Sequence, residues 1–174
     1  MLRILNKIRQ TGIVTESFST IVSDHEIEIV GQQVQAEIAR LFAGSLAIRQ
    51  VDAGSCNACE LEIHALNNPY YAIERFGVHF VASPRHADAL LVTGVVSRHM
   101  QTALLRTYTA TPAPKFVIAA GDCAVCGGEF GVSYASCGAV NQVIPVDVTI
   151  SGCPPTPHAL LAGILQAIQK KTLK

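Results

Sequence analysis

The cysteines are the residues of this chain best suited to chemistry, and there are six of them. Three short apolar runs that read as strands each end in a stretch that contains cysteine beside glycine. These stretches hold Cys56 and Cys59, Cys123 and Cys126, and Cys153, whereas Cys137 lacks this setting. In an open α/β sheet, ligands bind in the crevice outside the carboxyl ends of the strands. The pattern therefore predicts that strand ends far apart in sequence deliver thiols to one shared site.

Thiolates gathered at one site are the ligands of an iron-sulfur cluster. The C-x-x-C pair, Cys56 and Cys59, lets a single turn supply two ligands, and a cysteine followed by proline, as in Cys153-Pro154, also occurs in ferredoxin-type ligation. Nearby glycines allow backbone N–H groups to approach the sulfurs, which offsets the cost of burying an anionic cluster. These glycines are Gly54, Gly121, Gly127, Gly128 and Gly152. We predict a buried iron-sulfur cluster.

Other uses of the thiols fit parts of the pattern. A C-x-x-C beside a βαβ unit is typical of a thioredoxin-like dithiol, but that use leaves Cys123 and Cys153 unexplained. Structural zinc on two cysteine pairs, the second being Cys123 and Cys126, would need a spacing far longer than the usual one of roughly 15 to 20 residues. Buried thiols also act as small hydrophobic side chains. A zinc-binding structural scaffold is kept as the alternative from another class.

Composition narrows the function classes further. Thirteen basic and thirteen acidic residues give zero formal charge, which argues against a nucleic-acid partner. Only 15% of residues are charged, against about 25% in typical domains, which suggests surface covered by partner subunits. The start of the chain has no secretory signal pattern, so the cysteines are expected in a reducing compartment. No apolar run is long enough to cross a bilayer, which takes roughly 18 residues.

The elements that must position the cysteines form one α/β domain at residues 45–174. Strands are predicted at 46–51, 78–81, 89–93 and 116–120, with 143–146 as an edge strand or loop. Helices are predicted at 60–66, 70–76, 97–109 and 156–168, with Ser97 and Thr156 as N-caps. Alternating strands and helices indicate a doubly wound parallel sheet of flavodoxin-like type.

Residues 1–44 are predicted to be an N-terminal extension. Residues 1–10 fit a short basic amphipathic helix with Met1, Ile4, Leu5 and Ile8 on one face, able to lie at a membrane interface, in a partner's groove or on its own domain. A transit peptide is a further alternative, since no acidic residue precedes Glu16, but the low serine content disfavours it. Residues 12–23 are expected to be an extended connector. The loosely helical segment 25–42 is expected to dock on a neighbour rather than build the core.

Four linked motifs carry a resemblance to a known family. They are Cys56-Asn-Ala-Cys59-Glu60, Ser83-Pro-Arg-His-Ala-Asp88, Gly121-Asp-Cys123 and Gly152-Cys153-Pro-Pro155. In this order they resemble the small subunit of energy-converting, membrane-bound [NiFe] hydrogenases of formate hydrogenlyase type, and more loosely the [4Fe-4S]-carrying B-type subunit of respiratory complex I. The two residues between Cys56 and Cys59 match the hydrogenase branch, because the complex I proteins have adjacent cysteines there.

The resemblance implies one [4Fe-4S] cluster on a flavodoxin-like domain, with Cys56, Cys59, Cys123 and Cys153 as its ligands and no catalytic residue on this chain. Cys126 stands where relatives often carry Ser, and Cys126 and Cys137 are expected not to bind the cluster. Three further residues are candidates for the surroundings of the cluster. Glu60 is a candidate for a proton path, or a carboxylate that opens a helix. Arg85 is a candidate to offset the negative charge of the cluster, or it pairs with Asp88. His86 is a candidate proton-transfer group or quinone contact, or a structural residue.

The resemblance also implies an electron-transfer role in an oxidoreductase complex, without a small-molecule substrate on this chain. The expected partners are a large subunit holding nickel and iron, a ferredoxin-like two-cluster subunit and integral membrane subunits. The alternative is a component like the B-type subunit, working in a complex I-type quinone oxidoreductase. Either way the expected location is cytoplasmic, peripheral on the inner face of the cell membrane.

Overall fold

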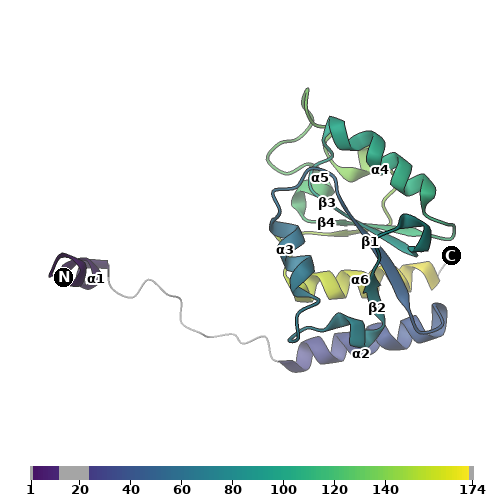
Figure 1. The fold of residues 1–174 in the computed structure, drawn as a ribbon, viewed down its shortest axis with the longest axis horizontal. Helices are drawn as coiled ribbons and strands as arrows, with labels where there is room; N and C mark the ends of the chain where they lie inside the picture. Colours follow the sequence, from purple (N-terminus) through teal and green to yellow (C-terminus); the bar gives the residue numbers. More distant parts are fainter. Residues whose placement is uncertain (1, 12–23, 173–174) are drawn as a thin grey trace.

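A five-stranded, all-parallel sheet forms the centre of the molecule (Figure 1). The computed structural model describes residues 2–11 and 24–172. The strands are β1 (Leu46–Asp52), β2 (Val78–Phe80), β3 (Ala89–Thr93), β4 (Phe116–Ala120) and β5 (Val148–Ile150). Their order is β2-β1-β3-β4-β5. This is the flavodoxin-like order, so the predicted fold class is confirmed, and its switch point lies between β1 and β3.

The central strands are apolar on both faces because helices cover both sides of the sheet. Every residue of β3 and β4 is buried, as expected for parallel strands between two helical layers. One core lies between the sheet and the helices α3 (Ala58–Ala65) and α6 (Pro157–Thr172). The other lies under α4 (Arg98–Ala110) and α5 (Asp122–Cys126). Short 3-10 turns complete the chain at Ile73–Phe76, Pro84–His86 and Val140–Gln142.

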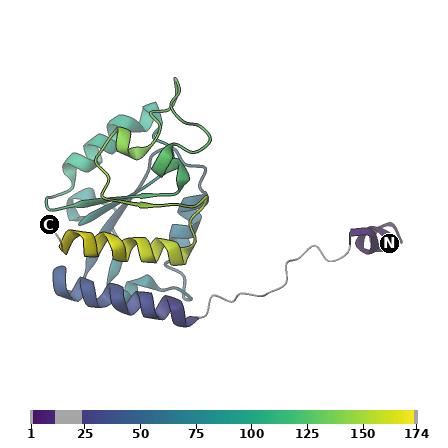
Figure 2. The same ribbon diagram turned by 180° about the vertical axis from the view of Figure 1, so that it is seen from behind.

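Helix α2 (Asp24–Leu41) packs on α6 and forms the outermost layer of the domain, as the view from behind shows (Figure 2). Its residues Ile27, Val34 and Ile38 are buried in the same core as the sheet. The expectation that this segment docks on a neighbour rather than building the core is therefore wrong. The loose periodicity misled because α2 covers another helix rather than the sheet. The boundary at residue 45 stays a prediction.

Local signals in the sequence indicate most of the other elements correctly. Ser97 caps α4, since its Oγ accepts a hydrogen bond from the Met100 amide, and Thr156 accepts one from Ala159 at the start of α6. The run 143–146 is loop, and the fifth strand is the run 148–150 that precedes Cys153. Helix α5 has no counterpart among the predicted elements, since its five residues are too few for a periodic signal.

Helix α1 (Leu2–Thr11) matches the helix predicted at the N-terminus. The connector expected at 12–23 lies outside the described residues, as does Met1 of the apolar face. Within residues 2–11 and 24–172, no helix has the length and apolar content needed to span a membrane.

Candidate metal centre

The loops that follow β1, β4 and β5 meet at the carboxyl edge of the sheet. Because these strands are parallel, all three loops leave the sheet on the same side. One cavity is lined by residues of these loops and of the loop after β3. Its lining includes all four cysteines predicted to act together, Cys56, Cys59, Cys123 and Cys153. The tertiary structure thus brings sulfurs from three strand ends to one place.

The thiols are close enough to influence each other electrostatically. Burial, followed in order of importance by negative charge on Glu60, Cys56, Cys123 and Cys153, raises the pKa of the Cys59 thiol to about 11. Burial also raises the pKa of Cys123, followed by the charges of Cys153 and Cys56. Because like charges repel, each thiol that loses its proton makes deprotonation of the neighbouring thiols more costly. A cation bound among the sulfurs would reverse this effect and favour the thiolates.

Two glycines leave room for the sulfurs. A Cβ at Gly121 would lie 2.6 Å from Cys59 Sγ, and a Cβ at Gly128 would lie 2.8 Å from Cys123 Sγ. Both distances are far below van der Waals contact, so any side chain at either position would displace a sulfur. Both glycines also have positive φ, at 90° and 51°, which disfavours other residues. The backbone here is shaped around the sulfur atoms.

A reciprocal clasp joins the loops that carry Cys123 and Cys153. The Asp122 amide donates to the Gly152 carbonyl (2.9 Å), and the Gly152 amide donates to Asp122 Oδ1 (2.8 Å). Each partner is the residue just before a cysteine, so the clasp fixes the relative position of those two thiols. Sequence reasoning missed this role for Asp122. Its place at the end of an apolar strand, just before the cysteine, was the available signal.

Glu60 is buried, with 6% of its surface exposed, and ties two strand ends together. Its carboxylate accepts hydrogen bonds from Ser55 Oγ (2.5 Å) and from Thr93 Oγ1. Ser55 lies in the loop after β1 and Thr93 is the last residue of β3. Glu60 also lies in the first turn of α3, where a carboxylate is favoured by the helix dipole. Both uses considered from the sequence, a group beside the thiols and a helix-opening carboxylate, remain compatible with this position.

The structure does not bring Arg85 and His86 to the cysteines. Both lie in the 3-10 turn that precedes β3, whereas the cysteines lie beyond the carboxyl ends of the strands. Strand β3 alone separates these edges by about 13 Å, at about 3.3 Å per residue. Asp88, the alternative partner considered for Arg85, accepts a hydrogen bond on its carboxylate from the Ala47 amide. Arg85 is therefore poorly placed to offset charge at the cysteines, and the proposed role of His86 gains no support from its position.

The two remaining cysteines stand apart from the cavity. Cys126 is exposed at the end of α5, where its thiol donates to the Asp122 carbonyl (3.2 Å). Cys137 is buried in the core under α4 and α5, among apolar side chains. Neither lines the cavity shared by the other four. Their expected status as residues that bind no cluster stays a prediction, and this placement favours it.

The arrangement of the thiols differs from a compact site for a single metal ion. Among the residues that the structure describes, no three His, Cys, Asp or Glu side chains are grouped tightly enough to hold one metal ion. Tetrahedral zinc needs sulfurs about 3.8 Å apart, given Zn–S bonds of about 2.3 Å. A [4Fe-4S] cluster spreads its four thiolates over four different irons and so separates them further. Four thiols around one cavity, with glycines against two of the sulfurs, suit the larger group.

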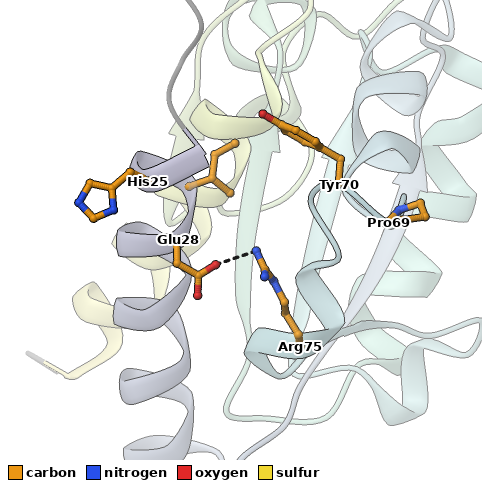
Figure 3. A pocket seen from close by; sticks show the side chains of 6 residues that line it. His25, Glu28, Pro69, Tyr70 and Arg75 are labelled. Atoms are coloured by element: carbon orange, nitrogen blue, oxygen red, sulfur yellow. Dashed lines mark ion pairs between the residues drawn. The ribbon is translucent and has the colours of Figure 1, made fainter.

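A larger pocket of about 520 Å³ lies elsewhere, between the start of α2 and the loop after α3 (Figure 3). Its lining includes His25, Tyr70, Glu28 and Arg75, and the last two form an ion pair of 2.8 Å. Both charged side chains are substantially exposed, and such surface pairs contribute little to stability. The pocket gathers no thiol and no buried polar group, so the cysteine cavity is the better candidate site.

Comparison with known proteins agrees with this geometry. Residues 56–167 match the family described as NADH ubiquinone oxidoreductase, 20 Kd subunit. The chain belongs to this family. The matched region begins at Cys56 and contains all four cysteines of the cavity, so the family resemblance predicted from the motifs is confirmed. The family is one of oxidoreductase subunits.

Individual relatives fall into both predicted branches. The chain is 44% identical over 135 residues to formate hydrogenlyase subunit 7 of Escherichia coli, covering 78% of this chain and 53% of that protein. It therefore spans about half the length of that relative. It is equally similar, over 135 residues, to "Probable membrane-bound hydrogenase subunit mbhJ" of Pyrococcus furiosus, covering 81% of that protein. It is 47% identical over 113 residues, or 64% of this chain, to a B-type NADH-quinone oxidoreductase subunit of Herpetosiphon aurantiacus, covering 63% of that protein.

A solved structure shares the fold of this family member. It is the structure of the membrane-bound sulfane sulfur reductase, an archaeal respiratory membrane complex. One of its chains aligns with a TM-score of 0.65 and 34% identity, covering 78% of this chain and 74% of that chain.

Proposed function

We propose that this chain is an electron-transfer subunit that carries one [4Fe-4S] cluster on Cys56, Cys59, Cys123 and Cys153. The observation that carries the proposal is the convergence of these thiols from three strand ends on one cavity. A [4Fe-4S] cluster supplies one-electron transfer at a potential tuned by its surroundings. The chain contributes the thiolates, the close backbone at Gly121 and Gly128, and the clasps through Asp122 and Glu60 that hold the loops.

The proposed complex is a membrane-bound hydrogenase-type oxidoreductase. In it, the chain relays electrons between a ferredoxin-like subunit and a large subunit holding nickel and iron, with integral membrane subunits as further partners. The relatives named as hydrogenase subunits support this assignment. So does the exposure of Cys56 and Cys153 in the chain alone. Electron transfer slows steeply with distance, so a site at the surface, covered by a partner, suits a relay.

The cluster is tested by replacing single cysteines in the complex as isolated. Cys123→Ala should remove the EPR signal of this reduced cluster and lower the iron of the complex by about four per copy of this chain. Cys126→Ala is the matched control, since Cys126 is exposed and outside the cavity, and it should keep both. An unchanged signal in Cys123→Ala would take Cys123 off the ligand list. Equimolar zinc in a colourless protein would instead establish the structural scaffold.

A complex I-type quinone oxidoreductase is the second candidate, favoured by the identity to an NADH-quinone oxidoreductase component. The spacing of Cys56 and Cys59 argues for the hydrogenase branch. The hydrogenase and quinone oxidoreductase candidates are distinguished by identifying the large subunit that co-purifies. The question is whether that subunit retains two C-x-x-C pairs able to hold nickel. Dye reduction driven by H2 supports the hydrogenase, and its absence together with quinone reduction establishes the second candidate. In both cases the chain is expected on the inner face of the cell membrane.

A further inference from the structure

Helix α1 separates an apolar face from a basic one. Leu5 and Ile8 are three residues apart and therefore neighbours on the helix surface, whereas Arg3 and Lys7, four residues apart, share the other side. Arg9 adds a third cation, and residues 2–11 contain no acidic side chain. The whole chain has zero formal charge, so this helix concentrates positive charge that the rest of the chain balances.

Among residues 2–11 and 24–172, nothing covers the apolar side chains Leu5 and Ile8 of α1. Leu5 and Ile8 are 57% and 62% exposed, while the apolar side chains of α2 that face α6 are buried. Arg3, Lys7 and Arg9 are also exposed. Of the three arrangements open from the sequence, packing of Leu5 and Ile8 on the described part of the domain is not the one observed. A helix of ten residues is also marginal in water by itself, so burial of this face would stabilise it.

We propose that α1 binds the surface of an anionic phospholipid bilayer, with Leu5 and Ile8 inserted at the boundary between headgroups and acyl chains. Charge complementarity selects this occupant. At a bilayer, Arg3, Lys7 and Arg9 extend toward anionic headgroups while the apolar face is buried. A partner groove that covered only the apolar face would leave the same cations in solvent, where charges contribute little. One short helix of this kind binds reversibly, so it supplements contacts made by partner subunits.

This inference rests on the peripheral membrane location in the proposed function and names α1 as the segment that contacts the membrane. Its test does not depend on the cluster. The full chain is mixed with vesicles of phosphatidylcholine, with or without phosphatidylglycerol, and sedimented. We expect binding only where phosphatidylglycerol is present, weakening as salt is raised because the attraction is screened. Binding that is absent from both vesicles, or equal on both, overturns the proposal. The iron content is measured in parallel and decides the cluster separately.

Variants assign the binding to α1. Replacing Arg3, Lys7 and Arg9 by Gln should weaken binding roughly 100-fold, since each basic residue near an anionic surface contributes roughly fivefold. Leu5→Gln with Ile8→Gln should also abolish sedimentation. The matched controls lie on the folded domain. They are Arg98→Gln with Arg106→Gln, and Ile29→Gln with Leu105→Gln, and they should bind as the unchanged chain does.

Two outcomes would contradict the assignment. If the control variants lose binding as strongly as the α1 variants, the attraction is general and does not belong to this helix. If the α1 variants bind vesicles normally but no longer co-purify with the large or membrane subunits, the occupant of the apolar face is a partner groove. Normal iron content in every variant ensures that a loss of binding does not reflect misfolding near the cysteines.

Discussion

Gly128 and Gly131 have the same backbone conformation and different surroundings. Both have a φ of 51°. A Cβ at Gly128 would lie 2.8 Å from Cys123 Sγ, whereas a Cβ at Gly131 would meet nothing within 4 Å. A substitution at either glycine places a side chain on a left-handed backbone, which costs about 1–2 kcal/mol. Only a substitution at Gly128 also crowds a sulfur, so comparing the two positions isolates the effect of that crowding.

We expect Gly128→Ala to lower the iron bound per chain, because the added methyl group displaces Cys123. Gly131→Ala should lose a comparable amount of stability from backbone strain but keep its iron. Iron analysis and chemical denaturation of both variants check this. Equal iron in the two variants would mean that the backbone at Gly128 is not shaped around a ligand sulfur.

Cys59 gives the metal-free protein a predicted pH dependence. Burial first, and then the charge of Glu60 and the other thiolates, raises its pKa to about 11 from an ordinary 9.0. The folded state therefore holds this proton more tightly than the unfolded state. The resulting stabilisation is fully present below about pH 9 and is lost as the pH rises through about 11.

The free energy of unfolding of the metal-free protein should fall by on the order of 2 kcal/mol between about pH 8 and about pH 11. Urea denaturation across this range measures it. Cys59→Ser does not titrate there and should show a much flatter profile, with the remainder due to Cys123, whose pKa is also raised. Matching profiles for the variant and the unchanged chain would show that Cys59 is not the group responsible.

At the scale of elements, α2 tests where the folded domain begins. Ile38 is 1% exposed in the core shared with the sheet, whereas Ile29, on the same helix, is 44% exposed. Ile38→Ala should cost about 2–5 kcal/mol of unfolding free energy. Ile29→Ala should stay within about 0.5 kcal/mol of the unchanged chain. The measurement is denaturation followed by the circular dichroism of the whole chain.

A single shifted transition in Ile38→Ala would show that α2 unfolds together with the sheet. If the main transition is unmoved and α2 melts separately, the boundary predicted at residue 45 is a true domain boundary. The burial of Val34 and Ile38 against α6 leads us to expect one transition.

At the scale of the whole molecule, the proposed cluster would join loops from β1, β4 and β5. A group that binds the folded chain and not the unfolded chain stabilises the fold by its binding free energy. Removing iron with a chelator should lower the thermal midpoint by several degrees. The far-ultraviolet circular dichroism should persist, because the two apolar cores on either side of the sheet hold the strands without the cluster.

The control for iron removal is Cys123→Ala, whose midpoint should already be low and should not fall further when chelator is added. A midpoint of the unchanged chain that is indifferent to chelator would contradict a cluster that links the three loops.

The sequence by itself determined the fold class and the cysteine pattern. Continuous apolar runs such as β3 and β4 are the signature of strands buried on both faces, and their alternation with helices requires a parallel sheet. A parallel sheet directs all strand ends to one edge, which is why cysteines after separate strands could be predicted to meet. The motifs around them were specific enough to identify the family.

Only the tertiary structure decided which other groups reach that edge. Arg85 belongs to one of the same four motifs as the cysteines, yet it precedes β3 and so lies at the opposite edge. The clasp between Asp122 and Gly152 and the bridge from Glu60 to Thr93 join residues far apart in sequence. Helix α2 belongs to the core because α6 presents an apolar surface to it. Such contacts depend on the relative placement of elements, and no local periodicity encodes that placement.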